Sequence, residues 1–167
     1  MSTAEHKAMA PARVRVFVLT VSDTRTDATD TAGRAIIEAL KSAGHIVAGK
    51  AIEKDEPERV AELVRQQAVI GDVDAIITTG GTGLTSRDST FEAIDALLTK
   101  RLPGFGELFR MLSYQDIGSA AMMSRACAGT IGKIVVIALP GSEKAVRLAM
   151  DKLVLPELTH LVQQATK

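Results

Sequence analysis

The sequence predicts a three-layer α/β/α fold with a mostly parallel sheet. The run at 14–21 is rich in β-branched residues and lacks clean polar–apolar alternation, which is typical of a strand buried on both faces. Similar apolar runs occur at 74–79 and 133–140, and segments with helical periodicity lie between the runs. Because alternating strands and helices form parallel sheets covered by helices, this pattern favours the fold class.

The first half of the chain contributes two strands and two helices. The expected elements are a strand at 14–21, a helix at 31–44, a strand at 45–53 and a helix that begins near Pro57. Asp30 or Thr31 can cap the first helix, and Gly44 can end it. Asp55 can cap the second helix through its carboxylate.

The second half continues the alternation. The expected elements are a strand at 74–79, a helix from Ser89, a helix within 102–118, a strand at 133–140 and closing helices over 141–165. Ser89 and Glu92 have the spacing of a capping box, in which each side chain bonds to the other residue's backbone. Pro156 is expected to interrupt the closing helices, because proline lacks the N–H that a helix interior needs.

Length and composition fit one globular domain. We expect a single domain at 13–167, because a chain of 167 residues can bury one hydrophobic core. Residues 1–12 lack the apolar segment of a signal peptide and are expected to form a disordered tail. No apolar run approaches the length of a membrane span, so no membrane partner is expected.

Charge and aromatic content argue against nucleic acid as a partner. The 20 lysines and arginines balance the 20 aspartates and glutamates, which leaves no net positive field. The chain has four phenylalanines, one tyrosine and no tryptophan, too few for a platform on which bases stack.

The cysteine and histidine residues do not predict a disulfide, a nucleophile or a metal site. Cys127 is the single cysteine, which excludes an internal disulfide and fits a reducing cytoplasm. Because it lies among small residues with no histidine nearby in the sequence, a buried, inert thiol is favoured over a nucleophile. His6, His45 and His160 are too scattered to predict a metal site.

Small or acidic residues follow four of the expected strands. They occupy residues 20–23, 53–56, 78–83 and 138–142. Ligands of open α/β sheets bind outside the C-terminal ends of the strands. We therefore expect these four segments to converge on one binding site.

The segment TTGGTGLTSRDST, residues 78–90, contains the sharpest signal. Gly80, Gly81 and Gly83 permit positive φ angles and a close approach of the backbone, and successive N–H groups can surround an anion. A helix follows, and its N-terminus also favours an anion. The segment lacks the lysine of a P-loop and the third glycine of a dinucleotide fingerprint, so a plain strand-to-helix connection stays open beside phosphate binding.

Two carboxylates flank this glycine loop. Asp88 follows the loop, and Asp55 lies after another expected strand. Carboxylates repel a phosphate unless a cation intervenes, and Mg²⁺ is commonly held by one or two carboxylates together with substrate phosphates. The arrangement predicts a nucleotide–Mg²⁺ site, with helix capping as the alternative role of Asp55.

Five segments together resemble the MoaB/Mog family of molybdenum cofactor biosynthesis proteins. They are TVSDTR, TTGGTGLTSRDST, PGFGELFRMLS, IGSAAMMSRACAG and ALPGS, in this order and spacing. The likeness extends from about Val14 to Leu161, and GHIVAGKAIEKDE and SRACAG are more similar to the MoaB branch.

The resemblance implies a molybdopterin-binding-like fold that assembles as a homotrimer, or in some MoaB-type members as a homohexamer. It also implies adenylylation of molybdopterin, in which the terminal phosphate of molybdopterin attacks the α-phosphate of ATP and pyrophosphate leaves. A downstream protein would then insert the metal. Because the substrate phosphate is the nucleophile, positioning and Mg²⁺ can supply the catalysis.

Roles for particular residues follow from the same resemblance. Asp55 and Asp88 are expected to be catalytic and to hold Mg²⁺. The nucleotide-binding residues are expected to be Gly80, Gly81, Thr82, Gly83, Pro140, Gly141 and Ser142. The molybdopterin-binding residues are expected to be Ser22, Asp23, Ser124 and Arg125. For Arg125, a structural salt bridge is the alternative.

Two features bear on whether the chain is an enzyme. The family often has a serine where Ala32 stands, which favours a non-catalytic carrier of molybdopterin or of a pathway intermediate. Doubtful adenylyltransferases of the MoaB branch carry glutamate where this chain keeps Asp55, which favours the enzyme. We therefore expect an enzyme. A generic nucleotide-binding regulatory module is a third possibility, but the family likeness of the segments PGFGE and IGSAAMMSRA would then be a coincidence.

Overall fold

A six-stranded sheet forms the centre of the protein, with strand order β2-β1-β3-β6-β5-β4. The computed structural model describes residues 2–70 and 72–167. The strands are β1 (Arg15–Val21), β2 (Ile46–Glu53), β3 (Ala75–Thr79), β4 (Lys100–Arg101), β5 (Cys127–Ile131) and β6 (Ile134–Leu139). The first four strands in the sheet order are parallel, and β5 and β4 pair antiparallel.

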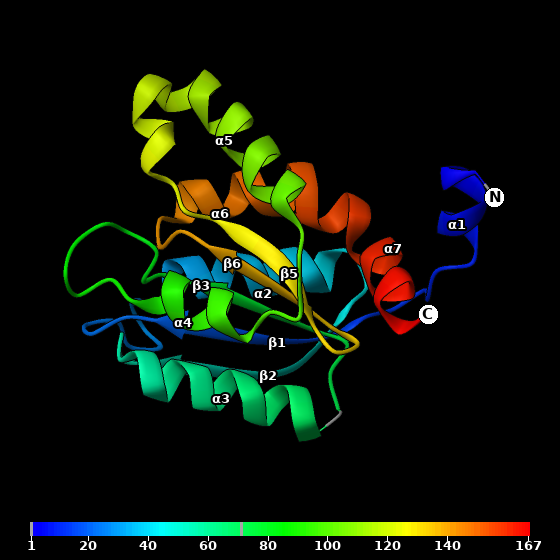
Figure 1. The fold of residues 1–167 in the computed structure, drawn as a ribbon, viewed down its shortest axis with the longest axis horizontal. Coiled ribbons are helices and arrows are strands. Elements are labelled where there is room, and N and C mark those ends of the chain that lie inside the picture. Colours follow the sequence, from blue (N-terminus) through cyan, green and yellow to red (C-terminus); the bar gives the residue numbers. More distant parts are fainter. Residues whose placement is uncertain (1, 71) are drawn as a thin grey trace.

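Helices cover both faces of the sheet, which confirms the three-layer α/β/α prediction (Figure 1). The helical elements are α1 (Thr3–Ala8), α2 (Thr31–Ser42), α3 (Pro57–Ile70), α4 (Thr90–Leu97), α5 (Pro103–Ile117), η1 (Gly118–Met123), α6 (Glu143–Ala149), η2 (Met150–Val154) and α7 (Leu155–Thr166). Buried residues of α3 and α4 share one core, and those of α2, α5, α6 and α7 share the other.

Strand β1 contributes to both cores, which explains the unbroken apolar run Val16–Leu19 within it. Val16 and Val18 belong to the core of α2 and α5, whereas Phe17, Leu19 and Val21 belong to the core of α3 and α4. Side chains alternate between the faces of a strand, so a strand covered on both faces needs apolar residues at every position. Each such side chain stabilises the fold by about 1.5–3 kcal/mol relative to an exposed one.

The sequence did not predict the antiparallel end of the sheet. β4 has two residues, both exposed, and β5 follows the turn that ends η1. Lys100 pairs with Thr130, and Arg101 pairs with Gly129. A Cβ on Gly129 would lie 2.2 Å from the backbone oxygen of Lys100, so glycine is required where these strands approach each other.

The chain termini depart from two sequence expectations. Residues 3–8, within the segment expected to be disordered, form α1, which Ser2 caps and which Lys7 joins to α7 through an ion pair with Glu157. Pro156 does not break the closing helices. It lies in the first turn of α7, directly after the π-helical segment η2, where a proline is tolerated.

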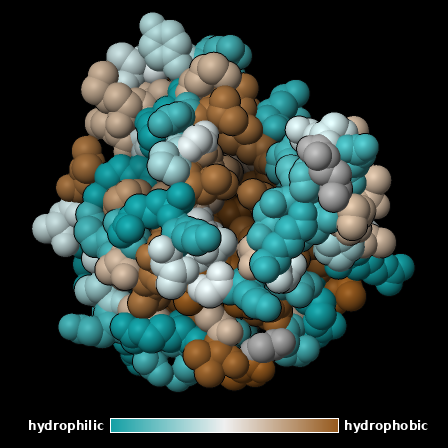
Figure 2. Space-filling model, turned by 45° about the vertical axis from the view of Figure 1, so that its right-hand side comes forward, coloured by the Kyte–Doolittle hydropathy of each residue, from teal (hydrophilic) through white to brown (hydrophobic). Residues whose placement is uncertain are grey.

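Apolar surface is unevenly distributed. Figure 2 shows hydrophobic residues within a recess that hydrophilic residues border. Most of the large apolar side chains that are exposed lie on or beside α5 and η1, namely Leu102, Leu108, Met111, Tyr114, Ile117, Met122 and Met123. Within the described residues, no helix has both the length and the apolar character needed to cross a membrane.

Candidate functional site

A cavity of about 300 Å³ opens at the C-terminal ends of the parallel strands. Segments that follow β1, β2, β3 and β6 line it, so the four strand ends converge as the sequence predicts. Seven of the expected site residues line this cavity: Ser22, Asp23, Asp55, Gly80, Gly81, Asp88 and Gly141. We call it the strand-end cavity.

The glycines of the loop after β3 are required by packing. Gly80 and Gly81 have φ angles of 95° and 68°, which other residues rarely adopt. A Cβ on Gly80 would lie 2.1 Å from the backbone oxygen of Val21, and one on Gly81 would lie 2.1 Å from the Thr90 hydroxyl oxygen. At Gly83 it would lie 2.6 Å from Asp88 Oδ2. The loop is thereby pressed between β1 and the start of α4.

Three successive N–H groups of the loop lack an acceptor among the described residues. Gly80 N–H donates to the Leu139 carbonyl at 3.0 Å, so it is already satisfied. The N–H groups of Gly81, Thr82 and Gly83 have no acceptor within residues 2–70 and 72–167. Buried N–H groups without a partner are rare in proteins, and Thr82 is buried. A row of this kind suits an anion.

The carbonyl partners of the loop determine where these N–H groups point. Gly81 C=O accepts the Thr90 N–H at 3.0 Å, and Arg125 donates to the carbonyls of Thr82 and Gly83. In a planar trans peptide, the N–H points opposite to the C=O. The N–H groups of Thr82 and Gly83 therefore point away from α4 and from the Arg125 guanidinium.

Asp55 does not cap α3, and that sequence-based alternative is wrong. The side chain is 5% exposed, and its Oδ1 accepts from Ser89 N–H at 3.2 Å, Ser89 Oγ at 2.8 Å and Thr90 Oγ1 at 3.2 Å. The expected capping box of α4 is also absent, because Ser89 gives its hydroxyl to Asp55 and Glu92 pairs with Arg125. A carboxylate 34 positions earlier thus secures the start of α4.

Asp88 lies beside Gly83 at the other end of the loop. Its Oδ2 accepts from the backbone N–H of Thr85 at 3.2 Å and from the Thr85 hydroxyl. Asp88 Oδ1 and Asp55 Oδ2 have no hydrogen-bond donor in the part of the chain that the structure describes. Each carboxylate therefore keeps one oxygen for a ligand.

This donor set fits Mg²⁺ better than a metal that needs an all-protein site. The described residues contain no group of three or more histidine, cysteine or carboxylate side chains that could hold a metal ion. Mg²⁺ retains several waters and is usually bound by one or two carboxylates with substrate phosphates. Asp55 and Asp88, which both line the strand-end cavity, are the carboxylates that could hold such an ion.

Asp23 is held by an arginine that the sequence analysis did not single out. Arg87 donates from Nε to Asp23 Oδ2 at 2.7 Å and from Nη2 to Oδ1 at 2.9 Å, and Asp55 N–H donates to Oδ1 at 3.2 Å. The Arg87 hydrogen bonds are the main cause that lowers the pKa of the Asp23 carboxyl. The available signal was that Arg87 is the only cation within the segment 78–90.

Asp30 forms a further wall of the strand-end cavity besides capping α2. It accepts from Thr20 Oγ1 at 2.7 Å and from Gly33 N–H at 2.9 Å, and Lys50 Nζ lies 3.2 Å away. Burial alone raises the pKa of the Asp30 carboxyl, but these partners outweigh burial and lower it. Ala32 lines the same cavity, so the missing hydroxyl belongs to this site.

The remaining expected site residues lie outside the strand-end cavity and have protein partners. Ser142 caps α6 through Ala145 N–H, and the Pro140 carbonyl accepts from Thr79 Oγ1 at 2.7 Å. Ser124 and Arg125 line a second cavity of about 310 Å³, between α4 and α5. Thr82 and Gly83 belong to the glycine loop but do not line the strand-end cavity, and their carbonyls accept hydrogen bonds from Arg125.

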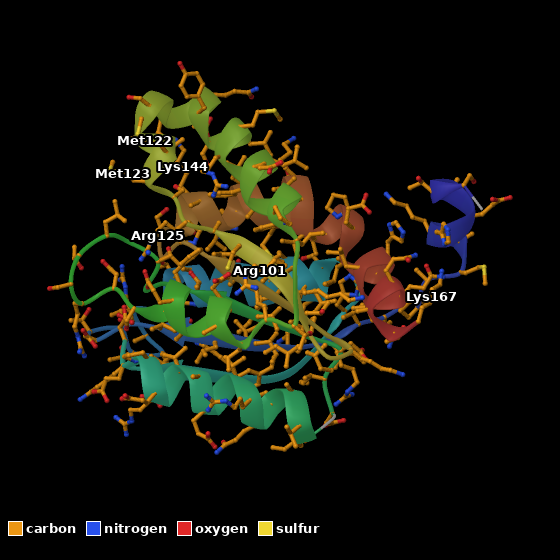
Figure 3. The ribbon with its side chains drawn as sticks, in the orientation of Figure 1. Arg101, Met122, Met123, Arg125, Lys144 and Lys167 are labelled. Carbon is orange, nitrogen blue, oxygen red and sulfur yellow. The ribbon has the colours of Figure 1, made fainter. Side chains whose placement is uncertain are left out.

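Arg125 forms the structural contacts that the sequence analysis kept as an alternative to ligand binding. Its guanidinium pairs with Glu92 and lies 4.8 Å from the centre of the Phe91 ring. It also donates to the two loop carbonyls, Thr82 and Gly83. Figure 3 shows Arg125 where the chain leaves η1 near this loop. Arg125 thus joins α4 to the glycine loop.

Cys127 lines the second cavity, and its chemistry follows from its burial. Burial, with a smaller contribution from Asp95, raises the pKa of the Cys127 thiol to about 11. The inert thiol predicted from the sequence agrees with this environment. At pH 8 we expect Cys127 to react with iodoacetamide about 100-fold more slowly than an ordinary free cysteine, because the thiolate is the reactive form. Mass spectrometry of the folded and urea-unfolded protein checks this; equal rates would contradict it.

Comparison with known proteins agrees with the fold and identifies the family. Residues 17–160 match the family described as "Probable molybdopterin binding domain", which defines the class of protein. Molybdenum cofactor biosynthesis protein B of Bacillus anthracis is 55% identical over 162 residues, which cover 96% of each chain. The chain belongs to the MoaB/Mog family of molybdenum cofactor biosynthesis proteins.

Solved structures give the same result. A crystal structure of molybdenum cofactor biosynthesis protein B matches with a TM-score of 0.91 and 53% identity, over 95% of this chain and 99% of that chain. Tungsten cofactor synthesizing protein MoaB from Pyrococcus furiosus matches with a TM-score of 0.84 and 37% identity, over 95% and 100%. These matches confirm the molybdopterin-binding-like fold.

Proposed function

We propose that this protein is a molybdopterin adenylyltransferase that depends on Mg²⁺ and ATP and releases pyrophosphate. The observation that supports the proposal most is the composition of the strand-end cavity. Asp55 and Asp88 line it, and each has one oxygen without a donor among the described residues. The adjacent loop has three N–H groups without an acceptor among the same residues. Carboxylates and N–H groups attract opposite charges, so a cation and an anion together satisfy this site.

Each residue has a distinct task in this proposal. The N–H groups of Gly81, Thr82 and Gly83 bind a phosphate of the nucleotide, in the orientation that Arg125 and Thr90 impose on the neighbouring carbonyls. Asp55 Oδ2 and Asp88 Oδ1 hold Mg²⁺, which would neutralise charge on the reacting phosphates. The protein supplies no nucleophile, because the molybdopterin phosphate is itself the attacking group.

Gly141 lies against the glycine loop at the end of β6. A Cβ on Gly141 would lie 3.3 Å from the Cα of Gly80, so the two loops are in contact. We propose that Pro140, Gly141 and Ser142 form the nucleotide side of the site, and that Ser22 and Asp23 face molybdopterin.

We further propose that the protein acts in the cytoplasm as a homotrimer or hexamer and passes its product to a metal-inserting protein.

The test is a single-turnover assay with molybdopterin, ATP and Mg²⁺ that measures pyrophosphate and adenylylated pterin. We expect product from the unmodified protein and at least a 100-fold lower rate for Asp88→Ala, because losing a metal ligand removes charge stabilisation at the reacting phosphates. Asp151→Ala is the matched control, since Asp151 is an exposed carboxylate outside the strand-end cavity.

The assay also separates the enzyme from a carrier. A carrier would bind molybdopterin tightly but release no pyrophosphate, with or without Mg²⁺. Ala32 is the observation that favours a carrier, because it lines the strand-end cavity without a hydroxyl group. If Asp88→Ala retained the full rate, the proposed Mg²⁺ site would be wrong even if product formed.

A further inference from the structure

The strand-end cavity has a charge balance that does not suit a polyphosphate. Four aspartates line it: Asp23, Asp30, Asp55 and Asp88. Within the described chain, its only arginine or lysine side chains are Arg25 and Arg87. Mg²⁺ on Asp55 and Asp88 would offset the charge of those two carboxylates, which leaves Asp23 and Asp30 beside a phosphate chain. A cationic side chain that can turn toward the phosphates would therefore stabilise the bound nucleotide.

Arg25 and Arg87 differ in what holds them. Arg25 donates from Nη1 to the Thr29 carbonyl at 3.0 Å, within its own loop. Arg87 lies in the exposed segment that joins the glycine loop to α4, and its side chain is 56% exposed. It reaches across the cavity to Asp23, which follows β1. The contact is a surface ion pair, which contributes little to stability.

The Arg87–Asp23 geometry is also the geometry of phosphate recognition. Nε and Nη2 donate in parallel to the two carboxylate oxygens, at 2.7 and 2.9 Å. A guanidinium fork binds carboxylate and phosphate in the same way, so the one can replace the other. Asp23 would keep one donor after such an exchange, because its Oδ1 also accepts the Asp55 N–H.

We propose that Arg87 is a substrate-binding residue that exchanges Asp23 for the polyphosphate of the nucleotide. In the free protein, Asp23 occupies the guanidinium that ATP needs and so acts as an internal competitor. When ATP binds, Arg87 turns from Asp23 to a phosphate oxygen, and the Asp23 carboxylate becomes free for solvent or for a second substrate. This inference rests on the proposed function, because it takes ATP as the ligand of the strand-end cavity.

Calorimetric titration with Mg²⁺–ATP and with adenosine tests the exchange. For Arg87→Ala we expect the dissociation constant of ATP to rise about 10- to 100-fold, as for the loss of a charge-assisted bidentate contact, with adenosine unaffected. For Asp23→Asn we expect the constant for ATP to fall about two- to fivefold, because the amide keeps the Asp55 N–H bond but no longer holds the guanidinium by charge. Arg65→Ala is the control, since Arg65 is similarly exposed and ion-paired on α3.

Opposite effects of the two variants distinguish exchange from a structural latch. If Arg87 only fastened the loop to Asp23, both variants would weaken ATP and adenosine binding alike and lower the unfolding midpoint together. That result would overturn the inference, as would an unchanged ATP affinity of Arg87→Ala. If the unmodified protein bound no ATP at all, the proposed function itself would fail, so the two failures are distinguishable.

Discussion

Replacing Gly80 by alanine is expected to lower the free energy of unfolding by about 2–5 kcal/mol. The φ angle of 95° costs an alanine about 1–2 kcal/mol. The new Cβ would also lie 2.1 Å from the Val21 carbonyl oxygen, and overpacking of this kind costs about 1–3 kcal/mol. The clash is with backbone, so β1 and the loop would have to separate. Urea unfolding followed by circular dichroism, at matched protein concentration, measures the loss.

Gly44→Ala is the control that separates backbone strain from the clash. Gly44 has a similar φ angle of 83°, but a Cβ there would meet nothing within 4 Å. We expect Gly44→Ala to lower the free energy of unfolding by only about 1–2 kcal/mol. Equal losses for both variants would mean that the contact with Val21 contributes nothing to the strain at Gly80.

Asp55→Ala is expected to affect both stability and activity. Removing the carboxylate leaves the Ser89 N–H and the hydroxyls of Ser89 and Thr90 without their acceptor at a buried position. Each unsatisfied buried donor costs about 1–3 kcal/mol, but the two hydroxyls can rotate toward other acceptors. We therefore expect the free energy of unfolding to fall by about 2–4 kcal/mol. In the proposed enzyme the same change also removes a metal ligand and abolishes adenylylation.

Comparison with Asp88→Ala isolates the structural part of the Asp55 effect. Among the described residues, the Asp88 carboxylate accepts only from Thr85, three residues away in the loop, so we expect its removal to change the free energy of unfolding by less than about 1 kcal/mol. Urea unfolding of both variants measures this difference.

A double-mutant cycle measures the coupling between Asp55 and Ser89. Urea unfolding is compared for Asp55→Ala, for Ser89→Ala and for the variant with both changes. Because Ser89 and Asp55 are hydrogen-bond partners, the losses of unfolding free energy should be less than additive, and additive losses would contradict the bond network.

The family of this chain and the composition of its strand-end cavity bear on different aspects of function. The family assignment places the protein in molybdenum cofactor biosynthesis. The site adds a physical reason to expect phosphate chemistry. Asp55, Asp88 and Gly81 line one cavity, and one oxygen of each carboxylate and three N–H groups of the loop have no partner among the described residues. Neither Asp55 nor Asp88 alone would support that proposal, since each also has a structural partner in the loop.

The elements with a strong local pattern were predictable from sequence. β1 is buried at six of its seven positions, and an apolar run without alternation indicates that by itself. Asp30 and Thr31 were the two candidates for the cap of α2, and Asp30 caps it through the nearby Gly33 N–H. These features depend on residues within one element or one turn, so the order of residue types contains the needed information.

Features of the candidate site needed the tertiary structure. Asp55 and the glycine loop were predictable as parts of a site, but the alternative role of Asp55, as the cap of α3, was wrong. Its donors Ser89 and Thr90 lie 34 and 35 positions later, at the start of α4. The pair of Arg87 with Asp23 spans 64 positions, and β4 exists only because it meets β5.

Sequence by itself therefore determined the α/β/α layers, the family and the strand ends where ligands would gather. Tertiary structure decided that Gly80 must be glycine because Val21 lies against it, and that Arg87 faces an aspartate across the strand-end cavity. The physical reason is the range of the interactions. Periodicity and capping act within a few residues, whereas hydrogen bonds and steric contacts depend on which distant segments the sheet brings together.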